Sequence, residues 1–202
     1  MTLLRLAAGL ILALTLSACG TMDTATRNAP LDLPAFEGGP EPTVVNRDYD
    51  VQGMTFFASD ALTVSERNSY YPFADIVWRG DPVGDRKAQI GGMFRTAIDR
   101  NEAALDGAIP VTLDIALVRF HGVTERTRFS VGGNYHIVFD ITVRDAVTGL
   151  IIEEPRRIEL NLAAPGGEAA VIAESRGQTE KVRVTDFLTQ VLKDEMSGEH
   201  LV

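Results

Sequence analysis

The chain has 202 residues, 45% of them hydrophobic, and its 28 Asp and Glu outnumber its 19 Lys and Arg. This acidic balance argues against a nucleic-acid partner, which requires a basic face, and against electrostatic docking onto anionic lipid. The hydrophobic content suffices for the core of one ordinary domain. The chain has a single cysteine, so it cannot form an internal disulfide.

A short apolar run opens the chain. It covers residues 6–16 after one positive charge at Arg5, and it is much shorter than the roughly 20 apolar residues of a transmembrane helix. A charged start, a short apolar core and a small-residue cleavage site are typical of a secretory signal peptide. A buried core helix is the alternative, but the polar stretch over 20–42 gives it nothing to pack against. We therefore predict a signal peptide over residues 1–18.

The end of this run, Leu16, Ser17, Ala18 and Cys19, resembles the lipobox of bacterial lipoproteins. The resemblance implies cleavage before Cys19, a covalent acyl anchor on its sulfur and a further acyl chain on its new amino group. Two or more acyl chains hold a protein stably at a membrane, whereas one holds it only marginally. Gly20 stands where Asp would retain a Gram-negative lipoprotein at the inner membrane. We therefore predict the periplasmic face of a membrane, with the inner leaflet of the outer membrane favoured.

Cleavage would leave 184 residues (202 − 18) with a net charge of −10, because Arg5 is the only charged residue removed and 18 basic residues then face 28 acidic ones. Membrane association is therefore expected from Cys19 alone. Residues 19–43 are rich in proline and glycine and predict a disordered tether, which could span roughly 80 Å when extended. An extended arm packed along the domain is the alternative. A single domain is predicted over 44–202.

Alternating apolar and polar residues predict three long strands in the second half of this domain, over 111–118, 135–144 and 150–162. Gly149 lies between the last two and predicts a hairpin turn. Segments over 51–57 and 75–78 predict two further strands.

Two long helices are predicted. Asp81 and Pro82 suit the N-cap and the first position of the first helix. Gly91 and Gly92 inside this helix indicate either close packing on a sheet or a kink. Residues 179–196 form the second long helix, after a shorter one over 168–176. The apolar stripe of the first helix consists of Ile90, Met93, Phe94, Ala97 and Ile98.

Together these elements predict an α+β fold, in which an antiparallel sheet of four to five strands carries the two long helices on one face.

No catalytic or metal-binding constellation is recognisable. His136 and Asp140 share a strand face and are interpreted as a solvated pair, and His121 lies near a loop that contains Glu125. The chain has no H-E-x-x-H motif and no second cysteine for a zinc site. We therefore expect a protein that is not an enzyme and that has no metal and no cofactor apart from the acyl anchor at Cys19.

Two segments are candidate binding surfaces. Residues 119–129 form a mixed connection between long strands, for which a plain solvated turn is the alternative. The other is a set of aromatic residues close in sequence, for which core and edge packing is the alternative. It comprises Phe56, Phe57, Tyr70, Tyr71, Phe73 and Trp78.

The lipobox, ADIVWRGDP at 74–82, GGNYHIVFD at 132–140 and GQTEKVR at 177–183 resemble an uncharacterised family of alphaproteobacterial lipoproteins with a domain of unknown function. More distantly, a strand ending in Trp78 and followed by a helix and a meander is similar to auxiliary lipoproteins of envelope transport systems. The family resemblance implies no activity.

The expected function is that of a non-catalytic, membrane-anchored periplasmic lipoprotein that binds an envelope protein as an accessory or adaptor in transport or assembly. A lipid- or small-molecule-binding module is the alternative, and it requires an apolar pocket between the helices and the sheet.

Overall fold

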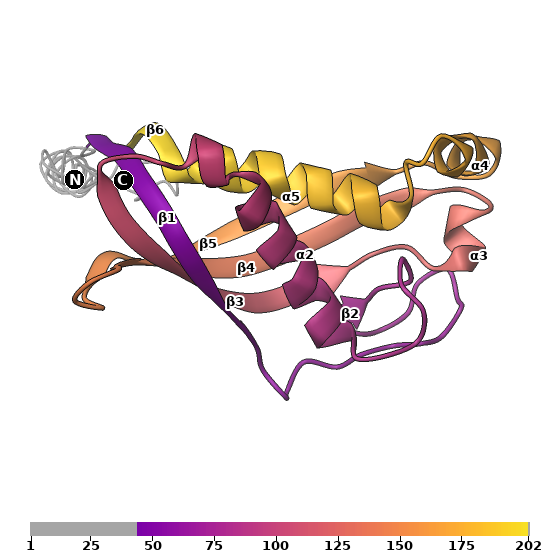
Figure 1. Cartoon of the computed structure of the whole chain (residues 1–202). Helices are drawn as coiled ribbons and strands as arrows, with labels where there is room; N and C mark the ends of the chain where they lie inside the picture. Colours follow the sequence, from indigo (N-terminus) through magenta and orange to yellow (C-terminus); the bar gives the residue numbers. More distant parts are fainter. Residues whose placement is uncertain (1–43, 202) are drawn as a thin grey trace, which may run out of the picture. The chain divides into compact units, whose positions relative to one another are not determined.

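The computed structural model describes residues 44–201, so the predicted signal peptide, the lipidation site at Cys19 and the tether lie outside the described residues. One curled sheet has the strand order β5-β4-β3-β1-β6, and β2 pairs with β3 beyond the end of β1 (Figure 1). The strands are β1 (Val44–Ala58), β2 (Ile76–Val77), β3 (Ile109–His121), β4 (Gly133–Asp145), β5 (Ile151–Ala164) and β6 (Ser197–Leu201). The helices are α2 (Arg86–Arg100), α3 (Glu125–Arg128), α4 (Glu168–Ser175) and α5 (Glu180–Met196), with a 3-10 turn η1 (Glu102–Ala104).

The α+β class is confirmed, but the prediction of a purely antiparallel sheet of four to five strands is wrong. Six strands form the sheet, and both β1 and β2 run parallel to β3. The physical reason is the connection through α2: a helix between two strands returns the chain to the same end of the sheet, so the second strand runs in the direction of the first.

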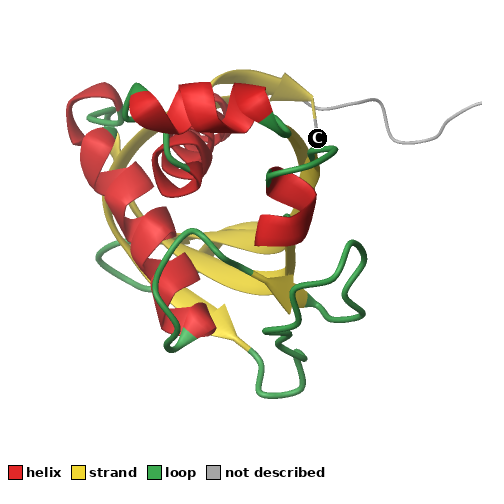
Figure 2. Ribbon diagram, turned by 90° about the vertical axis from the view of Figure 1, so that its right-hand side faces the viewer, coloured by secondary structure: helices red, strands yellow, loops and turns green. Residues whose placement is uncertain are grey.

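The two long helices contact one another along the molecule. α2 also lies against β1, and α5 reaches β1, β5 and β6. Figure 2, which is turned by 90° about the vertical axis from Figure 1, shows the strands curving around the helices. Within residues 44–201, no helix is long and apolar enough to span a bilayer.

α2 begins later than its sequence predicts. Asp85 is the N-cap, and its Oδ1 accepts a hydrogen bond from Ala88 N at 3.0 Å. Asp81, the predicted N-cap, instead accepts a hydrogen bond from Trp78 Nε1 at 2.9 Å and a salt bridge from Lys181 at 2.7 Å. The Asp81 carboxylate is therefore already occupied by tertiary contacts.

The predicted apolar stripe of α2 is buried in full. Gly91 confirms the close-packing interpretation, because a Cβ there would lie 2.8 Å from Cδ1 of Phe56 on β1. Gly92 has open space around it, so the same reason does not apply there. Phe94 reaches the sheet by an edge-on contact with Phe139, with ring centroids 5.0 Å apart.

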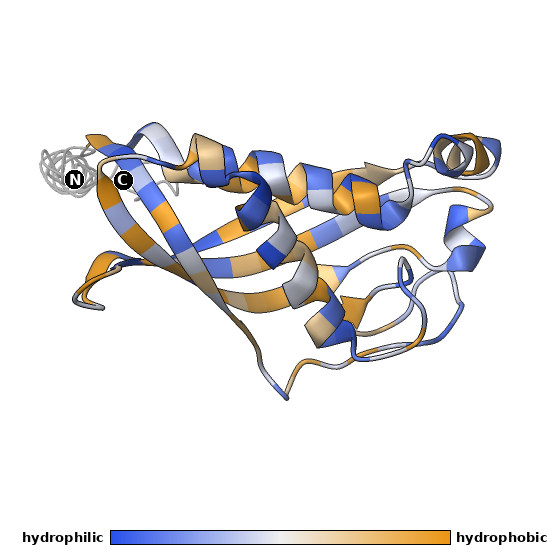
Figure 3. Ribbon diagram, viewed as in Figure 1, coloured by the Kyte–Doolittle hydropathy of each residue, from blue (hydrophilic) through white to orange (hydrophobic). Residues whose placement is uncertain are grey.

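β3 and β4 supply the centre of the core, and apolar and polar residues alternate along the strands (Figure 3). One irregularity interrupts β3: its register with β4 shifts between Leu117 and Arg119. The extra residue, Val118, reverses the alternation. Arg119 therefore leaves the core-facing row, and Phe120 is buried in its place.

The two outer strands differ. β5 forms one end of the strand order, contains Pro155 and shifts register twice against β4. β6 was not predicted, because a five-residue segment beginning Ser-Gly directly after a helix gives no strand pattern. It pairs antiparallel with the start of β1, from Val44↔Leu201 to Asp48↔Ser197.

Candidate functional site

A buried ionic cluster holds β1 against β5 where the sheet curls. Arg47, 3% exposed, donates from Nε to Glu153 Oε1 at 2.7 Å and from Nη2 to Oε2 at 2.9 Å. The Tyr49 hydroxyl donates to the same carboxylate at 2.7 Å. Burial opposes the charge on Glu153, but these hydrogen bonds outweigh it and lower the pKa of Glu153. Burial and the bond to Glu153 raise the pKa of Tyr49. Because each of these three side chains has a partner, the cluster joins β1 to β5 and stabilises the curled sheet.

A second ionic network fixes the loop that precedes α2. Arg86, also 3% exposed, donates from Nε to Glu66 Oε1 at 2.7 Å. Arg79 joins Glu66 to Glu125 on α3. The hydrogen bond from Arg86 lowers the pKa of Glu66. Glu125 is thus engaged by Arg79, while His121 Nδ1 lies 3.0 Å from the Ala74 carbonyl. The structure therefore gives Glu125 and His121 separate partners.

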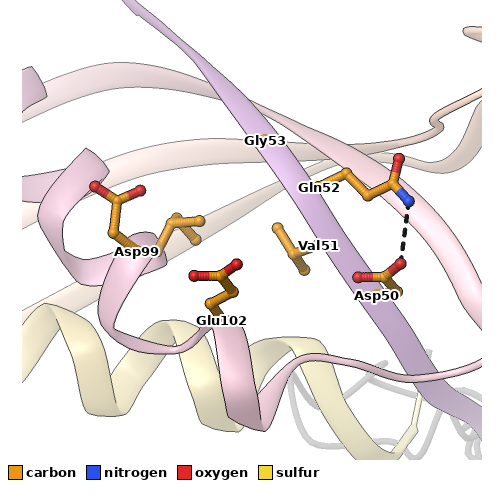
Figure 4. A pocket seen from close by; sticks show the side chains of 7 residues that line it. Asp50, Val51, Gln52, Gly53, Asp99 and Glu102 are labelled. Carbon is orange, nitrogen blue, oxygen red and sulfur yellow. Dashed lines mark hydrogen bonds between the residues drawn. The ribbon is translucent and has the colours of Figure 1, made fainter.

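A cleft of about 320 Å³ lies between β1 and the C-terminal end of α2 (Figure 4). Asp50 and Gln52 on β1 face Asp99 and Glu102 across it, and Gln52 Nε2 donates to Asp50 Oδ2 at 3.1 Å. Asp99 and Glu102 are exposed to solvent. Within the described residues, no group of three or more His, Cys, Asp or Glu is placed to hold a metal ion. The cleft is acidic and open, unlike the apolar pocket that a lipid-binding module was expected to have between its helices and sheet.

The other end of the domain exposes apolar side chains. The loop before β2, the turn after α3 and α4 lie together there, away from the start of β1 (Figure 1). Gly167, at the N-cap of α4, donates its backbone N–H to Arg128 O at 2.9 Å and so joins α4 to α3. We call this surface the apolar end. Its exposed residues are Tyr71, Phe73, Phe129, Val131, Val171 and Ile172.

Two hollows lie at the apolar end, and Tyr71 and His121 line both of them. The first, the Arg119 hollow, has a volume of about 390 Å³ and includes Phe73, Asp75 and Arg119. The second, the Gly132 hollow, has a volume of about 300 Å³ and is lined largely by apolar and small residues. These include Tyr70, Val123, Val131, Gly132 and Gly133.

The predicted aromatic set divides between core and surface. Trp78 is fully buried and stacks edge-on against Phe120 at a centroid distance of 5.6 Å, as the core-packing alternative requires. Phe56 packs on Phe94. Phe57, Tyr70, Tyr71 and Phe73 are exposed. The sequence alone could not separate the two groups, because burial depends on where the loop over 59–75 lies.

The other sequence candidates have separate partners. His136 Nε2 lies 2.8 Å from Glu159 Oε1, and Asp140 pairs with Arg157 at 2.8 Å. The hydrogen bond from Arg157 lowers the pKa of Asp140. Both pairs lie on the polar face of β4 and β5. The segment over 119–129 contains the end of β3 and the whole of α3, so it has more regular structure than the solvated turn offered as its alternative.

A family model matches residues 49–201 of the chain. The chain belongs to DUF6778, a family of unknown function. This confirms the predicted membership of an uncharacterised family, whereas the alphaproteobacterial origin and the link to transport lipoproteins stay predictions. A search of curated proteins found no match to the chain.

Two solved structures are distantly similar to this DUF6778 chain. A candidate lipoprotein from Caulobacter crescentus CB15 is 16% identical, with 52% of this chain and 79% of that chain covered and a TM-score of 0.32. A DUF330 protein from Xanthomonas campestris is 14% identical, with 76% and 94% covered and a TM-score of 0.39. Likenesses this distant carry no argument about function.

Proposed function

We propose that the protein is a non-catalytic lipoprotein, anchored through Cys19 at the periplasmic face of a membrane, that binds an envelope protein as an accessory subunit. The apolar end is the observation that carries this proposal. Several large apolar side chains are exposed on the elements at this end, and exposed apolar surface of this kind is a candidate site of interaction.

The position of the apolar end supports the same proposal. β1 begins at Val44 and pairs there with β6, at the end of the domain away from α3 and α4 (Figure 1). A tether joined to β1 would therefore leave the apolar end directed away from the attachment point. The outer membrane remains the favoured location because of Gly20.

Site-specific photocrosslinking in cells tests this proposal. A photoreactive phenylalanine analogue replaces Phe73, and a control chain carries it at Val147, an exposed apolar residue in the β4–β5 hairpin. We expect one envelope protein to be crosslinked in good yield from position 73 and not from position 147. The same experiment with Cys19→Ala should lose the crosslink, because the unanchored chain no longer meets its partner.

Two results would contradict the accessory role. One is the absence of any enriched protein at position 73 in the anchored chain. The other is an equal set of crosslinked proteins from both positions, which would indicate nonspecific contact.

A further inference from the structure

Arg119 is a partly buried cation without a carboxylate partner. Among the described residues, no Asp or Glu oxygen lies within 4.0 Å of its guanidinium, and its buried Nε donates no hydrogen bond. The other buried, unpartnered side-chain atom in this part of the chain is the Tyr135 hydroxyl oxygen, which belongs to the core. A buried Nε without a hydrogen-bond partner, on an arginine that makes no ion pair, makes this hollow a candidate site for an external anion.

Within residues 44–201, Arg119 makes one side-chain polar contact, and the atom it contacts also has a second possible partner. His121 Nδ1 lies 3.1 Å from Arg119 Nη2 and 3.0 Å from the Ala74 carbonyl oxygen. A single ring nitrogen either accepts from the arginine or donates to the carbonyl, so only one of these hydrogen bonds forms at a time. Burial lowers the pKa of His121, so the ring is neutral and adds no charge of its own. Arg119 is therefore the cation that an incoming anion would meet.

The β3 bulge places Arg119 in this position. Without the extra residue at Val118, Arg119 would continue the core-facing row of Ile115 and Leu117. Bulges are known to redirect side chains at functional sites. Asp75, on the same hollow, accepts hydrogen bonds from Thr63 N at 2.9 Å and Thr63 Oγ1 at 2.7 Å. These bonds, together with a smaller contribution from the charge of Arg119, lower the pKa of Asp75, but no Asp75 oxygen lies within 4.0 Å of the guanidinium.

We infer that the Arg119 hollow binds the oxyanion of a small anionic amphiphile, whose apolar chain crosses Tyr71 and lies in the Gly132 hollow. Tyr71 and His121 join the two hollows, and Phe73 at the rim is fully exposed. The volumes, about 390 and 300 Å³, are in the range of small-molecule sites.

The charges favour a monoanion. Arg119 supplies one positive charge, and the Asp75 carboxylate on the same rim would repel the second charge of a phosphate dianion. A carboxylate on an alkyl chain carries a single negative charge for Arg119 and an apolar chain for the Gly132 hollow. This site shares Tyr71 and Phe73 with the apolar end that is proposed to bind an envelope protein. The two proposals can fail separately, because calorimetry on the purified chain tests the ligand and crosslinking in cells tests the protein partner.

Titration calorimetry with decanoate tests the inference. The mature chain over 19–202 is used with Cys19→Ala, so that no acyl group competes for the site. We expect decanoate to bind and Arg119→Gln to weaken binding by about tenfold or more, the loss expected for a charge-assisted hydrogen bond. Arg95→Gln is the matched control, because Arg95 is exposed on α2 and the same charge is removed. It should bind decanoate as the parent chain does.

Phe73→Ser tests the apolar part of the site without touching the core, because Phe73 is fully exposed. It should weaken decanoate binding several-fold and leave the melting temperature unchanged. Decanol, which lacks the charge, and inorganic phosphate, which lacks the chain, should both bind much more weakly than decanoate. At pH 8, where octyl phosphate is a dianion and His121 is neutral, octyl phosphate should bind more weakly than decanoate.

Several outcomes would overturn the inference. Equal affinity for decanol and decanoate would show nonspecific apolar binding, and equal affinity for inorganic phosphate would show a plain anion site. Unchanged binding in both Arg119→Gln and Phe73→Ser would place the ligand elsewhere. A site that takes an acidic peptide but no decanoate would assign Arg119 to a protein contact.

Discussion

Arg47 and Arg119 both lie on central strands of the sheet, but their surroundings differ. Arg47 is buried between β1 and β5, where the sheet curls, and makes two hydrogen bonds to Glu153. Arg119 lines a hollow and has no carboxylate within 4.0 Å in the described part of the chain. The first arginine joins β1 to β5, and the second is left for an external anion. The buried, paired arginine stabilises the fold, whereas the arginine without an ion-pair partner at the surface is the candidate binding residue.

Removing the carboxylate partner of Arg47 should give the largest effect. Glu153→Gln leaves the buried guanidinium with only the longer contact to Glu195, whose Oε2 lies 3.8 Å from Arg47 Nη1. We expect this change to lower the free energy of unfolding by about 3 kcal/mol. Urea denaturation measures this loss. Glu154→Gln, an exposed change on the same strand, is the control and should cost less than about 0.5 kcal/mol. Similar midpoints for the two variants would show that Arg47 does not depend on Glu153.

The contribution of Glu153 should also depend on pH. Because its folded-state pKa is lowered from 4.5, its stabilisation is present above about pH 4.5 and is lost as the pH falls through the lower folded value. The difference in unfolding free energy between the parent chain and Glu153→Gln should therefore shrink below pH 4.5. A difference that is constant from pH 7 to pH 3 would refute this linkage.

Glu180 provides the opposite case among the buried carboxylates. It is 4% exposed at the start of α5, and burial raises its pKa even though Arg128 lies 3.6 Å away. Its stabilisation is full below about pH 4.5 and is lost as the pH rises through the raised value. Glu180→Gln should therefore increase stability at pH 7 and lose that advantage at pH 4.

Thermal melting at the two pH values measures the Glu180 effect. Glu174→Gln is the matched control, since Glu174 is exposed and also pairs with Arg128, at 3.0 Å. A destabilised Glu180→Gln at pH 7 would mean that the ion pair with Arg128 outweighs burial.

The smallest expected effect on stability belongs to Arg119. Because no carboxylate loses its partner, Arg119→Gln should change the free energy of unfolding by no more than about 0.5 kcal/mol. Urea denaturation beside Glu153→Gln makes the comparison direct. A loss as large as that of Glu153→Gln would show that Arg119 is structural and would remove the contrast between the two arginines.

The sequence predicted the parts of the fold that depend on local periodicity. The stripe on α2, the alternation of β4 and the hairpin at Gly149, whose φ is 72°, all follow from spacing or from one residue type. The parallel pairing of β1 with β3 was missed because no local pattern reports which strands become neighbours. β6 was missed because it is short and polar.

The site was less accessible to sequence reasoning. Tyr71, Phe73 and the segment over 119–129 were identified as candidate surfaces, but Arg119 was not separated from its neighbours. Its orientation depends on one inserted residue, Val118, and strict alternation would have placed it in the core. The lipidation of Cys19 stays a prediction, because it lies outside the described residues.

The outer strand β5 has a consequence for behaviour at high concentration. A strand at the edge of a sheet can recruit another strand and so start aggregation. Pro155 lacks a backbone donor, and the two register shifts on either side of Val143 make the ladder irregular at the same place. Arg156 and Arg157 add charge beside the proline. The edge is thus a poor template for a second chain, and the domain should resist strand-to-strand association even when it is concentrated.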